Sequence, residues 1–173
     1  SFEQVAHRLV TLRRPGAEGI PFGFLRSDPA GRLTKQFPLP GLMLPNTGHA
    51  CPLWAIYEAF RTPETIVRQV VRFADGGRYL FVARTVTRRP ANFGDLSVAS
   101  SVMLATDVLH ADGTVYARGL DLDDQAADVP VGPACRLCTR RDCPARQEEA
   151  PAPGGGQAAI RAPLVPQDFD RRW

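Results

Sequence analysis

Three of the four cysteines in this chain lie within one short segment, and the fourth is far away in the sequence. Cys135, Cys138 and Cys143 form the pattern C-x2-C-x4-C in "ACRLCTRRDC", whereas Cys51 opens the stretch "CPLWAIYEAF". Sulfurs this close along the chain are poor disulfide partners for one another, because adjacent bridges would strain the backbone. A metal centre that uses all four thiolates would require the fold to bring the two segments together.

Two kinds of metal centre fit these four cysteines. A structural zinc ion takes four thiolates and commonly uses C-x2-C, but zinc ribbons usually contain two such pairs and this chain has one. Plant-type ferredoxins use C-x4-C-x2-C with one remote cysteine, and the two short gaps occur here in reverse order. Cys143-Pro144 also repeats the Cys-Pro ending of bacterial ferredoxin runs. The spacing favours an iron–sulfur cluster, with zinc as the alternative and His49 as a rival fourth ligand.

The residues around the cysteines suit an anionic group. Four arginines flank the three clustered cysteines against a single aspartate, Asp142: they are Arg136, Arg140, Arg141 and Arg146. Positive charge lowers the pKa of a thiol and stabilises the thiolate that binds metal. Cys51 is expected at the N-cap of a helix that begins at Pro52, where the helix dipole also favours a thiolate.

The rest of the chain predicts an α+β domain, an antiparallel sheet with flanking helices. Ser1 and Gln4 fit a capping box for a helix that ends before Pro15-Gly16, and apolar residues at helical spacing follow Pro52 as far as Phe60. Three hairpins are expected, joining residues 20–26 with 32–37, 66–73 with 79–86, and 97–109 with 114–119. The helices are expected to cover one face of this sheet.

Composition and charge exclude several classes of function. The 173 residues suffice for one domain with an ordinary core, and no apolar run is long enough to cross a membrane. The net charge of +3 is scattered in small arginine pairs and does not predict a nucleic-acid-binding surface in this chain. No Ser/His/Asp arrangement, HExxH helix or phosphate-binding loop is present, so we expect a domain without enzymatic activity.

Several longer segments resemble a known family. The segments "SFEQVAHRLVTLRRPG", "GHACPLWAIYEAF", "YLFVARTVTR", "VYARGLDLDD" and "CRLCTRRDCPAR" are similar, in this order, to the C-terminal domain of the short-chain fatty acyl-CoA regulator family. These bacterial transcription factors govern the methylcitrate and glyoxylate cycles. The likeness runs from about Ser1 to Arg146, and the sequence beyond departs from the family's pattern.

The resemblance implies an organisation and a set of partners. Residues 1–14 would link to a preceding domain, 15–128 would form a GAF-like ligand-sensing domain, and 129–147, the Cys-rich segment, would bind an iron–sulfur cluster of the 4Fe–4S type through Cys51, Cys135, Cys138 and Cys143. Residues 148–173, rich in Pro, Ala and Gly, predict a disordered tail. The implied effector is CoA or a short-chain acyl-CoA, and DNA contact would belong to a separate N-terminal domain. A cytoplasmic location is expected, and the full-length protein could form a homodimer.

An acyl-CoA site needs cationic groups for phosphates and apolar or aromatic groups for the rest of the ligand. The candidate residues for such a site are Arg26, Trp54, Tyr57, Arg84 and Arg118. The acidic run at Asp121, Asp123 and Asp124 is interpreted as a surface turn in preference to a metal site. The alternative for the whole chain is a zinc-stabilised module that docks a partner protein.

Overall fold

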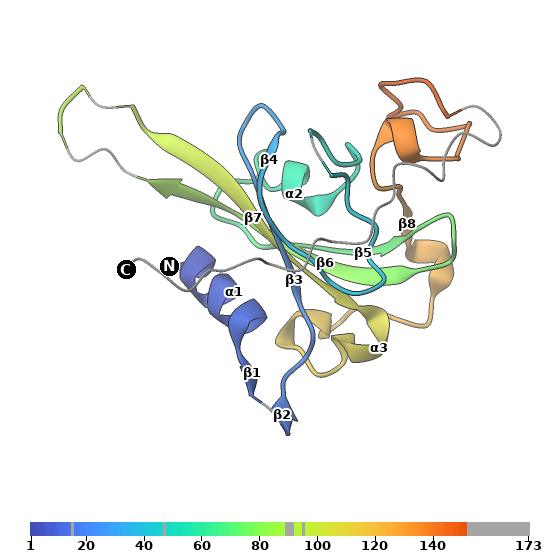
Figure 1. Cartoon of the computed structure of the whole chain (residues 1–173), viewed down its shortest axis with the longest axis horizontal. Helices are drawn as coiled ribbons and strands as arrows, with labels where there is room; N and C mark the ends of the chain where they lie inside the picture. Colours follow the sequence, from blue (N-terminus) through green and yellow to red (C-terminus); the bar gives the residue numbers. More distant parts are fainter. Residues whose placement is uncertain (15, 47, 89–91, 95, 152–173) are drawn as a thin grey trace.

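The computed structural model describes residues 1–14, 16–46, 48–88, 92–94 and 96–151, in which a six-stranded mixed sheet forms the centre of an α+β fold (Figure 1). The strand order is β4-β3-β7-β6-β5-β8. The strands are β3 (Gly23–Ser27), β4 (Leu33–Phe37), β5 (Val67–Arg72), β6 (Arg78–Arg88), β7 (Val98–Asp107) and β8 (Val129–Pro130). All pairings are antiparallel except that of β5 with β8, which is parallel. The predicted α+β class is confirmed, with one parallel edge that the sequence did not predict.

Two of the three predicted hairpins are confirmed, and the third is wrong. Strands β3 and β4 pair across the turn at residues 28–32, and β5 and β6 pair across residues 73–77. After β7, however, the chain forms the short helix α3 (Val108–Ala111) and the 3-10 helix η1 (Val115–Ala117). Both edges of β7 are already paired, with β3 and β6, so residues 114–119 have no free strand edge beside it. The chain instead folds back and buries Ala111 and Ala117 against the sheet.

Helix α1 (Phe2–Thr11) begins with the predicted capping box. The Ser1 hydroxyl accepts from the Gln4 backbone N–H at 3.3 Å, and the Gln4 side chain accepts from the Ser1 amine at 2.7 Å. The helix ends earlier than predicted, because residues 13–14 (β1, Arg13–Arg14) pair with β2 (Ala17–Glu18). Ala6 and Val10 pack onto the sheet beside Phe24, so α1 belongs to the core of this fold.

Both faces of the sheet are covered, whereas the sequence predicted cover on one face. Helices α1 and α3 lie on one side, and α2 (Ala55–Glu58) lies on the other with residues 39–44 (Figure 1). The α2 side contains the larger core, built around the fully buried Trp54 and Phe81, whose ring centroids are 5.2 Å apart. The Cys-rich segment lies on this same side and includes the 3-10 helix η3 (Cys135–Leu137); the 3-10 helix η2 (Gln125–Ala127) precedes it.

The helix predicted from Pro52 to Phe60 has only one turn. Residues 51–54 form a separate turn, in which the Trp54 N–H donates to the Cys51 carbonyl at 3.1 Å. Trp54 is the N-cap of α2 and is extended, with φ −74° and ψ 143°. Its indole N–H donates to the carbonyl of Gly132 at 2.9 Å. The extended backbone at Trp54 places the indole for this bond, and a continuous helix would place it elsewhere. Cys51 therefore lies before the helix. The prediction that Cys51 is the N-cap is wrong, because Trp54 occupies that position.

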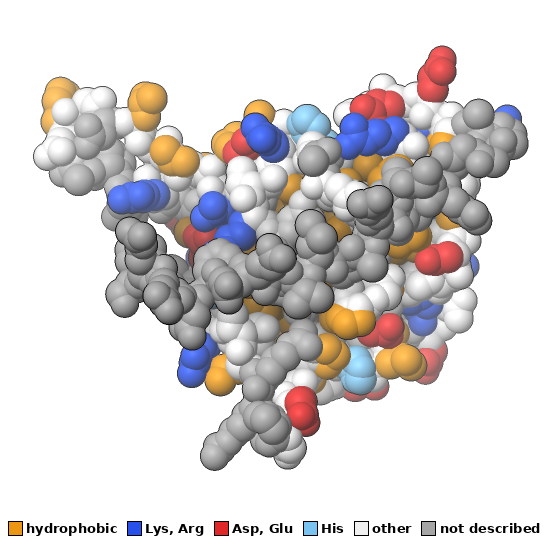
Figure 2. Space-filling model, viewed as in Figure 1, with side chains coloured by type: hydrophobic (Ala, Val, Ile, Leu, Met, Phe, Trp, Pro, Cys, Tyr) orange, Lys and Arg blue, Asp and Glu red, His pale blue; other side chains and the backbone are white. Residues whose placement is uncertain are grey.

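The surface agrees with the modest net charge. On the face that Figure 2 shows, Lys and Arg side chains are interspersed with Asp and Glu, without one continuous basic patch among the coloured residues. No helix within the described residues is long and apolar enough to cross a membrane. The predicted tail lies outside the described residues from 152 onward.

Candidate metal centre

All four cysteines line one cavity. The cavity is small, with a volume of about 10 Å³, is partly open to solvent, and lies between the turn that contains Cys51 and the Cys-rich segment (orange in Figure 1). Cys51 and Cys138 are buried, whereas Cys135 and Cys143 are partly exposed. Two segments that are distant in sequence thus place their thiols around a single space, as the spacing argument required.

Backbone and indole hydrogen bonds bring these two segments together. The Cys51 N–H donates to the Pro133 carbonyl at 3.0 Å, beside the Trp54 bond to Gly132. The segment is also fastened to the sheet, because the Val131 N–H donates to the Arg72 carbonyl at 3.0 Å. These contacts position Cys51 against residues 131–133.

Gly132 permits the close approach of Cys138. A Cβ built at position 132 would lie 2.6 Å from the Cys138 Sγ and 2.8 Å from its Cβ, well inside van der Waals contact. Gly132 is therefore part of the site, because any side chain there would displace a thiol. Sequence reasoning missed this residue, since a glycine between a short strand and a proline is typical of an ordinary turn.

Two of the flanking arginines hold backbone carbonyls around the cavity. Arg140 donates through Nη2 to the Arg72 carbonyl at 3.1 Å and through Nε to the Val131 carbonyl at 3.4 Å. Arg146 donates through Nη1 to the Cys135 carbonyl at 3.0 Å and through Nη2 to the Cys138 carbonyl at 3.1 Å. The sequence predicted only their charge, whereas the structure shows that they also shape the loop that carries the cysteines.

Burial determines the acidity of the Cys51 thiol. Desolvation raises the pKa of Cys51 above its ordinary value of 9.0, and the thiols of Cys135 and Cys138 raise it further. Backbone N–H groups of Gly132 and Leu53 lower the pKa in part but do not outweigh burial. The net effect on this pKa is therefore opposite to the depression expected from a helix N-terminus.

The thiols surround the cavity and do not converge on one point. Among the residues that the structure describes, no three His, Cys, Asp or Glu side chains are placed to hold a single metal ion. A backbone N–H also approaches one sulfur, since Gln147 N lies 3.5 Å from the Cys135 Sγ. His49, the rival ligand, is exposed and its Nε2 lies 3.1 Å from the Ala30 carbonyl oxygen, outside the lining of this cavity.

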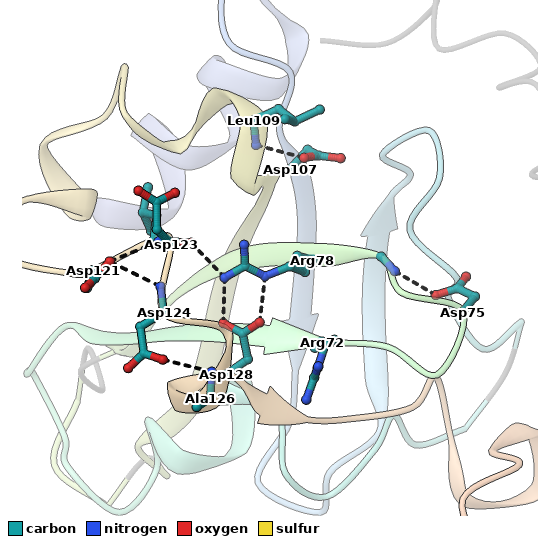
Figure 3. Close-up of polar contacts among 12 residues, drawn as sticks. Arg72, Asp75, Arg78, Asp107, Leu109, Asp121, Asp123, Asp124, Ala126 and Asp128 are labelled. Atoms are coloured by element: carbon teal, nitrogen blue, oxygen red, sulfur yellow. Dashed lines mark hydrogen bonds and ion pairs between the residues drawn. The ribbon is translucent and has the colours of Figure 1, made fainter.

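The start of the Cys-rich segment is anchored by a buried ion pair (Figure 3). The Asp128 side chain, 1% exposed, accepts from Arg78 Nε at 2.6 Å and from Arg78 Nη2 at 2.9 Å. Asp121 accepts from the backbone N–H groups of Asp123 and Asp124, so this acidic run forms a surface turn, as predicted. The turn and the ion pair fix the chain just before β8.

The five predicted effector-binding residues do not meet in one place. Arg26 on β3 and Arg84 on β6 both pair in register with Val102, so they share the face that α1 covers. Trp54 and Tyr57 belong to the core on the opposite face. The fifth residue, Arg118, is exposed beyond η1.

The partners of these side chains differ. The Arg26 guanidinium is paired with Glu3 at 3.0 Å. The Tyr57 hydroxyl donates to the Gly31 carbonyl at 2.8 Å, and the Trp54 indole is engaged by Gly132. Arg84 is half-buried, and its guanidinium has no hydrogen-bond or ion-pair partner among the described residues. The guanidinium of Arg118 likewise has no partner among these residues, so Arg84, which is half-buried, and Arg118, which is exposed, are the two members of the predicted set that are open to a further partner.

Comparison with known proteins identifies the family. The profile described as "Short-chain fatty acyl coenzyme A regulator, C-terminal" matches residues 11–153. The chain belongs to this family. It is 43% identical over 148 residues to the HTH-type transcriptional regulator RamB of Mycobacterium tuberculosis, a match that covers 84% of this chain and 31% of RamB. It is 45% identical over 143 residues to the propionyl-CoA carboxylase regulator of Cereibacter sphaeroides, which covers 83% of this chain and 31% of that protein.

A solved structure has the same fold. A Mycobacterium tuberculosis transcriptional regulator superposes with a TM-score of 0.79 at 38% identity, over 87% of this chain and 46% of that one. The present chain spans about a third of the length of the two curated relatives named above. These relatives are transcriptional regulators, in agreement with the prediction of a regulatory domain and not an enzyme.

Proposed function

We propose that this chain is the effector-sensing C-terminal domain of a bacterial transcriptional regulator of short-chain fatty acid metabolism. In this proposal it binds an iron–sulfur cluster through Cys51, Cys135, Cys138 and Cys143 and responds to an acyl-CoA-type effector. DNA recognition would lie in another part of the full-length protein, since the relatives are of the HTH type and this chain covers 31% of their length. Membership of the family and the names of its relatives support the regulatory assignment.

The observation that carries the metal part of the proposal is the cavity lined by four thiols. The donor set is entirely sulfur, which suits an iron–sulfur cluster or zinc. Zinc draws four thiolates onto one ion, with zinc–sulfur distances of about 2.3 Å. Both centres are compatible with an all-thiol lining. The C-x2-C-x4-C spacing with one remote cysteine favours the cluster over the zinc-stabilised interaction module.

The cavity also offers a positive environment. Arg140 and Arg146 line it together with the thiols. Arg146 Nε is buried and has no hydrogen-bond partner among the described residues, so a donor is left over beside the proposed site. When bound, an iron–sulfur cluster would supply a change in charge with redox state and a link between the two cysteine-bearing segments. The chain's own residues already hold those segments together and exclude part of the solvent.

Metal analysis tests this part directly. Protein purified without oxygen should be brown and contain iron and sulfide, with visible absorption that bleaches on reduction. Each Cys→Ala change at the four positions should remove the colour or make it labile, because each thiol lines the same cavity. Stoichiometric zinc without iron in the wild-type preparation would reject the cluster and support the zinc-stabilised module.

The effector part of the proposal is supported by the family's description and by Arg84. A half-buried guanidinium without a partner among the described residues, between Val82 and Val86 on its strand and beside Val102, is suited to an anionic group such as a phosphate. Calorimetric titration of propionyl-CoA into the metal-loaded protein should show binding that Arg84→Gln weakens. Arg61→Gln, an exposed arginine beyond α2 on the opposite face, is the control. If none of the three proteins binds propionyl-CoA, the acyl-CoA assignment for this chain is refuted.

A further inference from the structure

The Arg146 side chain is the most fully engaged group in the Cys-rich segment. Its Nη1 donates to the carbonyls of Cys135 and Glu148, both at 3.0 Å. Its Nη2 donates to the carbonyls of Cys138, at 3.1 Å, and of Arg140. Two of these four carbonyls belong to cysteines of the C-x2-C turn, so the guanidinium fixes the backbone on which the Cys135 and Cys138 thiols stand.

The fifth donor of this guanidinium is unsatisfied. A guanidinium carries five N–H groups, and the four Nη bonds leave Nε–H, which is buried without a partner among the described residues. Buried donors are almost always paired in native proteins, so an unpaired one indicates a partner that the protein atoms alone do not supply. Arg146 lines the cavity with all four cysteines, which places this donor beside the proposed cluster.

The charge of Arg146 is also uncompensated locally. No carboxylate forms an ion pair with it among the described residues, and the neighbouring Arg140 adds a second positive charge to the same cavity. Two cations that share a partly buried cavity disfavour each other unless an anion lies between them. Four metal-bound thiolates would supply that negative charge.

We propose that Arg146 is a positioning residue for the bound metal centre, through which the protein fixes the C-x2-C turn and tunes the reduction potential. Its Nη groups hold the turn, and Nε–H and the positive charge act on the bound group. This inference rests on the cluster proposed above. Because reduction adds negative charge, a nearby cation and N–H donor stabilise the reduced state and raise the potential.

The test compares Arg146→Lys and Arg146→Gln with Arg141→Gln. Arg141 is the matched control, because it is an exposed arginine of the same segment that does not line the cavity. All proteins are loaded anaerobically with iron and sulfide, and iron content and midpoint potential are measured. We expect Arg141→Gln to match the wild type and Arg146→Gln to shift to a lower potential. Arg146→Lys keeps the charge but cannot bridge the carbonyls, so its potential should lie between the two.

The outcomes separate this role from the cluster itself. Wild-type protein that takes up no iron would refute the cluster and this role together. Iron-loaded Arg146 variants with the wild-type potential would refute the role of Arg146 alone.

If the variants take up no iron, hydrogen exchange of the iron-free proteins decides. Faster exchange confined to residues 134–148 supports the positioning role. Equally accelerated exchange in β6 and β7 would show general unfolding and overturn it.

Discussion

Replacing Gly132 with alanine should disturb the cysteine site through one steric contact. The new Cβ would lie 2.6 Å from the Cys138 Sγ and 2.8 Å from the Cys138 Cβ, where non-bonded carbon atoms prefer about 3.5–4.0 Å. Rotation about χ1 could move the Sγ away, but the Cβ is fixed to the backbone. The backbone of the Cys135–Cys138 turn, or that of residue 132, must therefore shift.

The structure indicates what such a shift would cost. On one side, the Gly132 carbonyl accepts from the Trp54 indole; on the other, the Cys138 carbonyl accepts from Arg146. Either bond must lengthen when the two residues separate. Gly132 does not have a positive φ, so alanine meets no backbone penalty and the effect isolates the contact. Overpacking of this kind costs about 1–3 kcal/mol, which lowers the melting temperature by roughly 2–12 °C for a chain of this size.

Thermal unfolding of iron-free protein, followed by circular dichroism, measures this cost. Gly19→Ala is the matched control, because an added Cβ there meets nothing within 4 Å and Gly19 has no positive φ. Its stability should change by less than about 0.5 kcal/mol. In a Cys138→Gly background the Gly132→Ala change should become milder, since both clashing atoms are gone. A Gly132→Ala protein as stable as Gly19→Ala would refute the packing of Cys138 against residue 132.

Three further predictions concern buried ionisable groups. Asp128→Asn should destabilise the protein by about 3 kcal/mol in urea unfolding, because it leaves the Arg78 charge without its buried partner, whereas exposed Asp123→Asn should have little effect. Burial raises the pKa of Tyr79 from 10.0 to about 12, so the folded state binds the proton more tightly and stability should fall as pH rises through this range. Tyr79→Phe should reduce that slope, and the part that remains would come from Tyr57, whose pKa burial also raises. Burial also raises the pKa of Cys51 above 9.0, and metal binding must displace this proton, so iron uptake should strengthen from neutral pH toward pH 9; uptake independent of pH would contradict Cys51 as a ligand.

The sequence predicted most of the sheet because its signals are local. Alternating residues and Gly- or Asp-containing turns specify β3–β4 and β5–β6 within each hairpin. The segment after β7 has a similar local pattern, but its pairing depends on whether a strand edge is free, which is a property of the whole sheet. The long helix predicted after Pro52 failed for a related reason. Its apolar spacing reports which side chains are buried, and it does not show that the Trp54 indole bonds to a distant carbonyl.

The candidate site divides in the same way. Cysteine type and spacing are visible in the sequence, so the four thiols could be grouped before the fold was known. The roles of Gly132 and Arg146 could not be predicted from the sequence. Gly132 allows Cys138 to approach because it has no side chain, and Arg146 acts by donating hydrogen bonds to neighbouring carbonyls. The predicted effector residues are of a suitable chemical type but come from separate elements. The register that places Arg26 and Arg84 on one face and Trp54 on the other is set by long-range pairing.

The contacts of the Cys-rich segment show where a metal centre would add to the stability of the fold. As far as Pro133, the segment is held by the sheet and the core, through the bonds of Val131 to Arg72, Gly132 to Trp54 and Pro133 to Cys51. Beyond Pro133, Arg140 donates to the Arg72 carbonyl of the sheet, while Arg146 donates to carbonyls of residues 135–148.

A metal bound by the four thiols would therefore order residues 134–148 and leave the sheet largely unchanged. Of the four cysteines, Cys51 is the one in the hydrophobic core, and it is joined through its turn to Trp54 and α2. The contacts that can carry an influence of metal state to an effector site elsewhere in the domain include this turn, Gly132, and the bond of Arg140 to the Arg72 carbonyl. Because such coupling is reciprocal, an effector that shifts Trp54 would change metal affinity by the same factor.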